Sequence, residues 1–171
     1  MDDFEVPLHL NLLAKFKTHH GTIAGLKDRG NHIECLKIWC SPAFLDAYCF
    51  TVLVSPDGKA CYLRKLLWAM FSQTQDKPFH TALEVELPTE YLESILTELG
   101  AITMNPFQTS SDIILDAALI GVDFYRGDTR VELSWMGSFE GAYKELEDWR
   151  AKTVRGFARF FPEDANSYSY T

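Results

Sequence analysis

The chain has 171 residues, of which 47% are apolar and 23% are charged, which is enough apolar material for the core of a single domain. Its 10 glycines and 7 prolines are too few for a collagen-like or low-complexity chain, and its apolar fraction is too high for a disordered one. The net charge of −8 argues against nucleic-acid binding, which needs clustered Lys and Arg.

The N-terminal third begins with a predicted amphipathic helix over residues 5–20, where leucines and Phe16 recur at helical spacing. Three glycines and mixed charges indicate a loop over residues 21–31. A strand is predicted over residues 32–40, and Ser41-Pro42 then suits the N-cap and first turn of a short helix.

The middle of the chain contains the clearest local signal, a β-hairpin over residues 48–63 whose turn is Ser55-Pro56-Asp57-Gly58. Residues 64–71 fit either a continued strand or a helical turn. Apolar and acidic residues alternate over residues 83–87, which predicts a half-buried strand. A helix is expected to start at Pro88-Thr89 and to end before Gly100.

The same order of elements recurs in the last third. A second hairpin is predicted over residues 121–135, with its turn at Arg126-Gly127-Asp128 and with Asp123 on a polar outer face. A long helix over residues 138–160 is expected to carry acids early and bases late, as the helix dipole prefers.

Strands followed by helices and joined by tight hairpins predict an α+β fold. We expect a mainly antiparallel sheet built from two β-hairpins and packed on one face by amphipathic helices. Residues 1–162 are expected to form a single domain, and residues 163–171 a flexible tail.

The net charge resides in one interval. There is no Lys or Arg between Lys77 and Arg126, whereas eight acidic residues lie there: Glu84, Glu86, Glu90, Glu93, Glu98, Asp112, Asp116 and Asp123. These carboxylates predict either a solvated face that keeps the protein soluble or a surface that attracts a basic partner. They disfavour attraction to anionic lipid.

The compartment is predicted from the N-terminus and the cysteines. Residues 1–5 carry three acids and no base, unlike a secretory signal, and the apolar runs are far shorter than the ~18 residues of a membrane span. The four cysteines, Cys35, Cys40, Cys49 and Cys61, lie in apolar, strand-like surroundings and are expected to be reduced. We therefore expect a cytoplasmic protein.

Searches for catalytic motifs do not yield a reaction. The sequence has no nucleotide-binding glycine loop, no His-Glu-x-x-His and no calcium loop. Ser138 follows Gly137 directly, so it fits a helix N-cap better than a nucleophile elbow. Two carboxylate pairs are candidates for acid–base chemistry: Asp112 with Asp116, and Asp123 with Glu132.

A zinc site is the only metal hypothesis. His32, Cys35 and Cys40 supply suitable ligand types, with His19 or His20 as further candidates. Their spacing is irregular, and a Cys within a strand acts as a small buried hydrophobe. We expect neither a metal nor a cofactor.

The sequence thus favours a non-enzymatic binding protein, most concretely a bacterial immunity protein that neutralises a basic toxin through an acidic surface. The expected partner-binding residues are the following: Glu84, Glu86, Glu90, Glu93 and Glu98, with Tyr91 or Trp68 as an apolar anchor. The alternatives are a small hydrolase that uses Asp and Glu, and an acidic mimic of nucleic acid.

Overall fold

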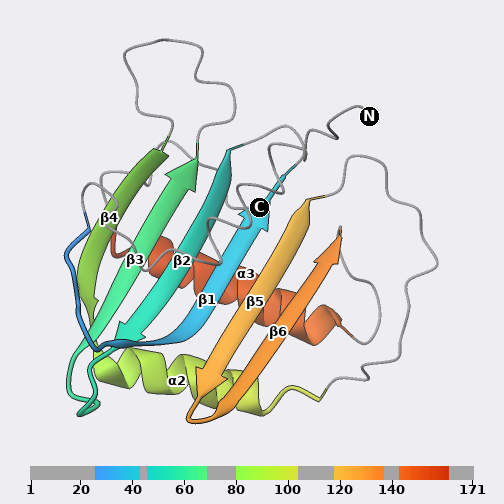
Figure 1. Ribbon diagram of the computed structural model, residues 1–171. Coiled ribbons are helices and arrows are strands. Elements are labelled where there is room, and N and C mark those ends of the chain that lie inside the picture. Colours follow the sequence, from blue (N-terminus) through green and yellow to red (C-terminus); the bar gives the residue numbers. More distant parts are fainter. Residues whose placement is uncertain (1–25, 43–45, 69–79, 104–117, 137–142, 162–171) are drawn as a thin grey trace, which may run out of the picture.

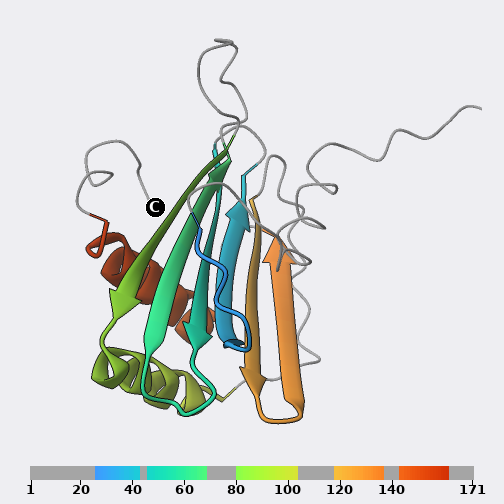
Figure 2. The ribbon, with the colours of Figure 1, turned by 60° about the vertical axis from the view of Figure 1, so that its left-hand side comes forward.

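The computed structural model describes residues 26–42, 46–68, 80–103, 118–136 and 143–161. Its elements, in chain order, are β1 (Ile33–Ser41), β2 (Ala47–Val54), β3 (Cys61–Trp68), β4 (His80–Leu87), α2 (Thr89–Gly100), β5 (Leu119–Arg126), β6 (Thr129–Met136) and α3 (Lys144–Ala158). The described strands form one antiparallel sheet in the order β4-β3-β2-β1-β5-β6. Both helices lie on the same side of this sheet (Figures 1 and 2).

The sheet is built in two parts that meet at β1. Strands β1 to β4 follow one another as neighbours, and β5 then pairs with the free edge of β1, with Lys37 opposite Asp123. This pairing joins residues 78 to 88 positions apart, so local sequence signals could not reveal it.

The two tight turns account for the register of the strands that they join. In the β2–β3 turn, the Ser55 hydroxyl accepts a hydrogen bond from the Ala60 N–H at 3.0 Å, and Gly58 has φ +72. Only two residues separate β5 from β6, and the first of them, Gly127, has φ +57. Glycine adopts these left-handed conformations without steric cost.

The core lies between the sheet and the helices. Side chains of β1, β2 and β3 pack there against the buried faces of both helices, for example Phe50 against Phe157, with ring centroids 5.6 Å apart. The Trp149 indole N–H of α3 donates to the Ile95 carbonyl of α2 at 3.2 Å. This contact fixes the two helices against each other.

The opposite face of the sheet has a small second cluster. Trp39, Ala47 and Cys49 are buried there, and Trp68 is half-buried against them. The Trp39 ring lies directly over Gly121, its partner in the β1–β5 ladder. A side chain at position 121 would occupy the space of that ring.

The predicted α+β class with an antiparallel sheet is confirmed. Ser41 is the last residue of β1 rather than a helix N-cap, and β3 continues as a strand to Trp68. Gly100 is the last residue of α2 rather than the residue after it. Asp123, expected on a solvated outer face, is buried, because β5 lies inside the sheet and not at its edge.

Several predictions fall on residues outside the described ranges. They are the helix over residues 5–20, the roles of Asp112, Asp116 and Ser138, and the tail over residues 163–171. The described part of the last predicted helix, α3, begins at Lys144.

Candidate binding groove between α2 and the β5–β6 hairpin

A groove of about 1020 Å³ lies between α2 and the strands β1, β5 and β6. Leu92, Leu96 and Leu99 line it from α2. These three residues recur at helical spacing, so one face of the helix presents them together. A volume of this size is typical of pockets that bind a small ligand or an apolar anchor of a partner.

The strand side of the groove is also aliphatic and aromatic, and its residues come from alternate positions of each strand: Ile33, Val54, Val122, Phe124, Val131 and Leu133. Val131 is 40% exposed and Ile33 is 59% exposed, although both are apolar. Exposed apolar side chains beside a groove indicate a surface that a partner can cover.

Polar groups also line the groove. Thr89, Glu93 and Thr97 line it from α2, and Arg126 lines it from the end of β5. Glu93 is exposed, and it is the only carboxylate among the described lining residues. The groove therefore presents one negative charge and one positive charge beside an apolar floor.

Two thiols lie in the floor of the groove, those of Cys35 and Cys61. Burial raises the pKa of Cys35 to about 12 and also raises the pKa of Cys61. A thiol must ionise to act as a nucleophile. At neutral pH both groups are therefore neutral and serve as small apolar surfaces.

The acidic residues of the interval differ in their surroundings. Glu86, Glu90 and Glu93 have exposed side chains. Glu98 is also exposed, and the Lys152 ammonium of α3 donates to both of its carboxylate oxygens at 2.8 Å. Within the described part of the chain, the exposed carboxylates of this interval that lie outside this ion pair are thus those of Glu86, Glu90 and Glu93.

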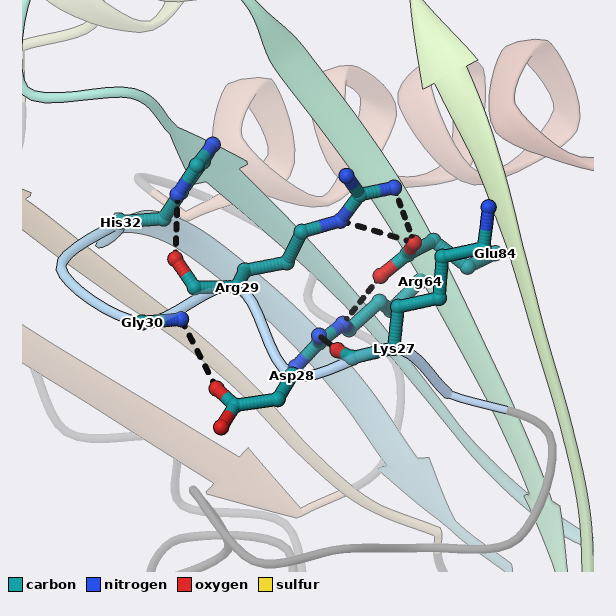
Figure 3. Close-up of polar contacts among 7 residues, drawn as sticks. All are labelled: Lys27, Asp28, Arg29, Gly30, His32, Arg64 and Glu84. Atoms are coloured by element: carbon teal, nitrogen blue, oxygen red, sulfur yellow. Dashed lines mark hydrogen bonds and ion pairs between the residues drawn. The ribbon is translucent and has the colours of Figure 1, made fainter.

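Glu84 belongs to a different structure, an ion-pair cluster on the sheet face opposite the helices (Figure 3). Arg29 Nε donates to Glu84 Oε1 at 3.0 Å, and Arg64 Nε donates to Glu84 Oε2 at 2.8 Å. The Glu84 side chain is 6% exposed. We therefore leave Glu84 out of any partner-binding surface.

The same cluster holds the segment before β1 against the sheet. The Arg29 guanidinium lies 3.4 Å from the centre of the Tyr62 ring, and the Arg64 side chain donates to the Lys27 carbonyl. Residues 27–32 are thereby held beside β3 and β4 (Figure 3). This is a structural role that the sequence pattern did not indicate.

Both expected apolar anchors pack against side chains of their own chain. Tyr91 packs against Phe157 and Phe160, with ring centroids 6.4 and 5.3 Å away. Trp68 is half-buried on the opposite face of the sheet, in the cluster with Trp39. The structure brings Glu93, and not these aromatic rings, to the groove.

A buried polar group on the opposite face was missed in the sequence. Lys37 is 3% exposed, and its Nζ lies 2.7 Å from Glu34 Oε1. Burial alone would lower its pKa, but the nearby Cys49 and Glu34 outweigh burial and raise the pKa. Lys37 therefore stays cationic, whereas a nucleophilic lysine must be neutral.

The carboxylate pair Asp123 and Glu132 is brought together, because the two residues face each other in the β5–β6 ladder. Asp123 is 1% exposed, and its neighbours Val122 and Phe124 point into the groove on the other face. The pair therefore does not open into the groove.

His32, Cys35 and Cys40 are not grouped into a metal site within the described ranges, and the further candidates His19 and His20 lie outside those ranges. Among the residues that the structure describes, no group of three or more His, Cys, Asp or Glu side chains is arranged to hold a metal ion. All four cysteines are free thiols and are buried. His32 Nδ1 is instead hydrogen-bonded to the Arg29 carbonyl.

No family model, no curated protein and no solved structure matches the chain. No helix in the described part of the chain is long and apolar enough to cross a bilayer.

Proposed function

We propose that this chain is a non-catalytic binding protein that inhibits a basic protein partner, most concretely an immunity protein that neutralises a toxin in the cytoplasm. Its binding surface is the groove together with the exposed carboxylates of Glu90 and Glu93. Glu86 does not belong to this surface, because side chains alternate along β4 and Glu86 therefore shares the face of Glu84, opposite the helices. The observation that carries this proposal is the position of Glu93, which is exposed and lines an aliphatic groove, on the helix that also exposes Glu90.

The two parts of this surface have different effects on binding. Exposed carboxylates attract a basic partner and raise the association rate, but they add little affinity. An apolar groove supplies affinity when it takes up an aliphatic or aromatic side chain of the partner. An inhibitor that must silence nearly every copy of a toxin needs nanomolar binding, about −12 kcal/mol, so both parts are required.

The partner expected from this chemistry carries a bulky apolar side chain with Lys or Arg beside it. The first candidate is the product of the gene immediately upstream, because an immunity gene normally follows the gene of its toxin. The test is to purify that product with this chain and to measure association by surface plasmon resonance at several salt concentrations.

Two matched pairs of variants separate the groove from the charges. Thr97→Phe places a large side chain at the groove, whereas Ser94→Phe adds the same bulk at an exposed position of α2 that does not line it. Glu90→Lys with Glu93→Lys reverses the charges near the groove, and Glu145→Lys with Asp148→Lys makes the same change on α3.

We expect Thr97→Phe to weaken binding at least about tenfold through faster dissociation. The α2 charge reversal should slow association. In wild type the association rate should fall with added salt, because the Debye length shrinks from about 30 Å at 0.01 M salt to about 8 Å at 0.15 M, and the charge reversal should remove this dependence on salt. If both α2 changes bind like their controls, the surface proposed here is wrong.

A further inference from the structure

Strand β6 is the last strand at one edge of the described sheet. Among the described residues it has a strand neighbour on one side only, β5. Most of its side chains are exposed, including Val131 at 40% and Met136 at 63%. An exposed edge strand of eight residues is a template on which a further strand can pair.

The hydrogen-bonding groups of β6 that point outward can be assigned from the hairpin. Arg126 and Thr129 close the two-residue turn, so Thr129 bonds inward to β5. Bonding direction alternates along an antiparallel strand. Arg130, Glu132 and Ser134 therefore direct their N–H and C=O groups away from β5.

The order of the charges along β6 makes this strand complementary to an antiparallel copy of itself. Arg130 and Glu132 lie two positions apart on the same face, with side chains 50% and 40% exposed, and they form an ion pair with each other. The Arg130 guanidinium also lies 4.9 Å from the centre of the ring of Tyr125, its partner in the β5–β6 ladder. Val131 separates the two charges and points to the other face.

We propose that β6 pairs with β6 of a second copy of this chain, in the antiparallel register centred on Val131. In that register Arg130 of each copy lies opposite Glu132 of the other. Four charges of alternating sign then meet on one face, and the two Val131 side chains meet on the other. The proposal does not depend on the function proposed above.

The hydrogen bonds and the charges select the same register. Pairing centred on Val131 places Arg130 of one copy opposite Glu132 of the other. The backbone N–H and C=O groups of both residues point outward from their own sheets, so the two residues can exchange hydrogen bonds. Centring the pair on Glu132 or on Arg130 would bring like charges directly opposite each other, which is unfavourable. The exposed valine at the centre would lose water from its surface on pairing.

The other edge strand, β4, does not offer the same match. It carries Glu84 and Glu86 and no Lys or Arg, so pairing with itself would bring carboxylates together. Glu84 is also held by Arg29 and Arg64 within its own chain. The two edges therefore differ, and only β6 has a sequence that complements a second copy. A closed two-fold dimer follows, with a twelve-stranded sheet formed from two sheets of six.

The test is sedimentation velocity on the full chain over about 5 to 500 µM, because an interface along one strand is small and its dimer is expected to be weak. Arg130→Glu and Glu132→Arg should each weaken dimerisation at least about tenfold, since each places like charges opposite one another. The double variant with both substitutions restores the alternation and should dimerise like wild type. An equimolar mixture of the two single variants should form a heterodimer, since one copy then supplies two anions and the other two cations.

Lys144→Glu is the matched control, because Lys144 is also exposed and paired within its own chain, with Asp148 on α3. It should leave dimerisation unchanged, and circular dichroism should show that every variant is folded. A wild-type monomer at every concentration would overturn the proposal. So would a dimer that the single substitutions leave intact, or a double variant or mixture that fails to recover association.

Discussion

Arg150 of α3 donates a hydrogen bond from Nη1 to the hydroxyl of Tyr48 on β2 at 2.8 Å, and both side chains are buried. The same guanidinium donates to the Glu147 carboxylate through Nε at 2.9 Å. Burial opposes the charge of Arg150, but these partners outweigh burial and raise its pKa. A charged group thus joins the last helix to the second strand.

Removing the tyrosine hydroxyl should destabilise the fold. We expect Tyr48→Phe to lower the free energy of unfolding by about 2 kcal/mol, because it deletes a hydrogen bond to a buried charge. Arg150→Met should cost about 3 kcal/mol, since Glu147 then loses its partner. Urea denaturation measures both. Lys144→Ala, which removes an exposed ion pair of the same helix, should change stability by less than about 0.5 kcal/mol.

Gly121→Ala should be strongly destabilising. A Cβ at this position would overlap the ring of Trp39, whose side chain is 2% exposed and cannot move aside without disrupting its neighbours. We expect a loss of about 3 kcal/mol in the free energy of unfolding by urea. Gly100→Ala is the control, because a Cβ added there would meet no atom within 4 Å beyond its own stretch of helix, and Gly100 ends that helix. That variant should be as stable as wild type or more stable by up to about 1 kcal/mol.

The Glu84 cluster predicts how stability depends on pH. Burial would raise the pKa of Glu84, but hydrogen bonds from Arg29 and Arg64 outweigh it and lower the pKa below its ordinary value of 4.5. A carboxyl whose pKa is lowered by folding adds stability above its unfolded pKa and loses it as the pH falls through the folded pKa. Denaturation measured between about pH 3 and pH 7 should therefore show a loss of stability below about pH 4.5.

Substitution of this carboxyl should reduce that loss. We expect Glu84→Gln to be less stable than wild type at neutral pH and to show a weaker dependence on pH in the acid range. Glu86→Gln, a change at an exposed position of the same strand, should retain the wild-type profile. Identical acid profiles for wild type and Glu84→Gln would contradict the role assigned to Arg29 and Arg64.

The thiols should be unreactive until the chain unfolds. Burial raises the pKa of Cys49 to about 12 and that of Cys40 to about 11. We expect a disulfide reagent to react slowly with the native protein and to titrate four thiols in denaturant without reductant. Because these thiols ionise near 9.0 when unfolded, stability should also fall as the pH rises above about 9. A cysteine that reacts as fast in the native protein as in denaturant would contradict its burial.

The sequence by itself determined much of the local structure. Alternating side chains predicted the strand over residues 83–87, and leucines at helical spacing predicted the helix that begins at Thr89. Both signals arise from neighbours along the chain, since side-chain direction follows the period of the backbone. The strand over residues 32–40 and the two tight turns have the same origin.

Tertiary structure decided what each polar side chain does. Glu84 and Glu86 look alike in the sequence, yet strand β3 and the segment before β1 bring two guanidinium groups to Glu84 and leave Glu86 exposed. Asp123 is buried because β5 pairs with β1, a contact between distant residues. The groove beside Glu93 likewise needs α2 and the β5–β6 hairpin together. Such arrangements depend on contacts that are long-range along the chain, and no local periodicity encodes them.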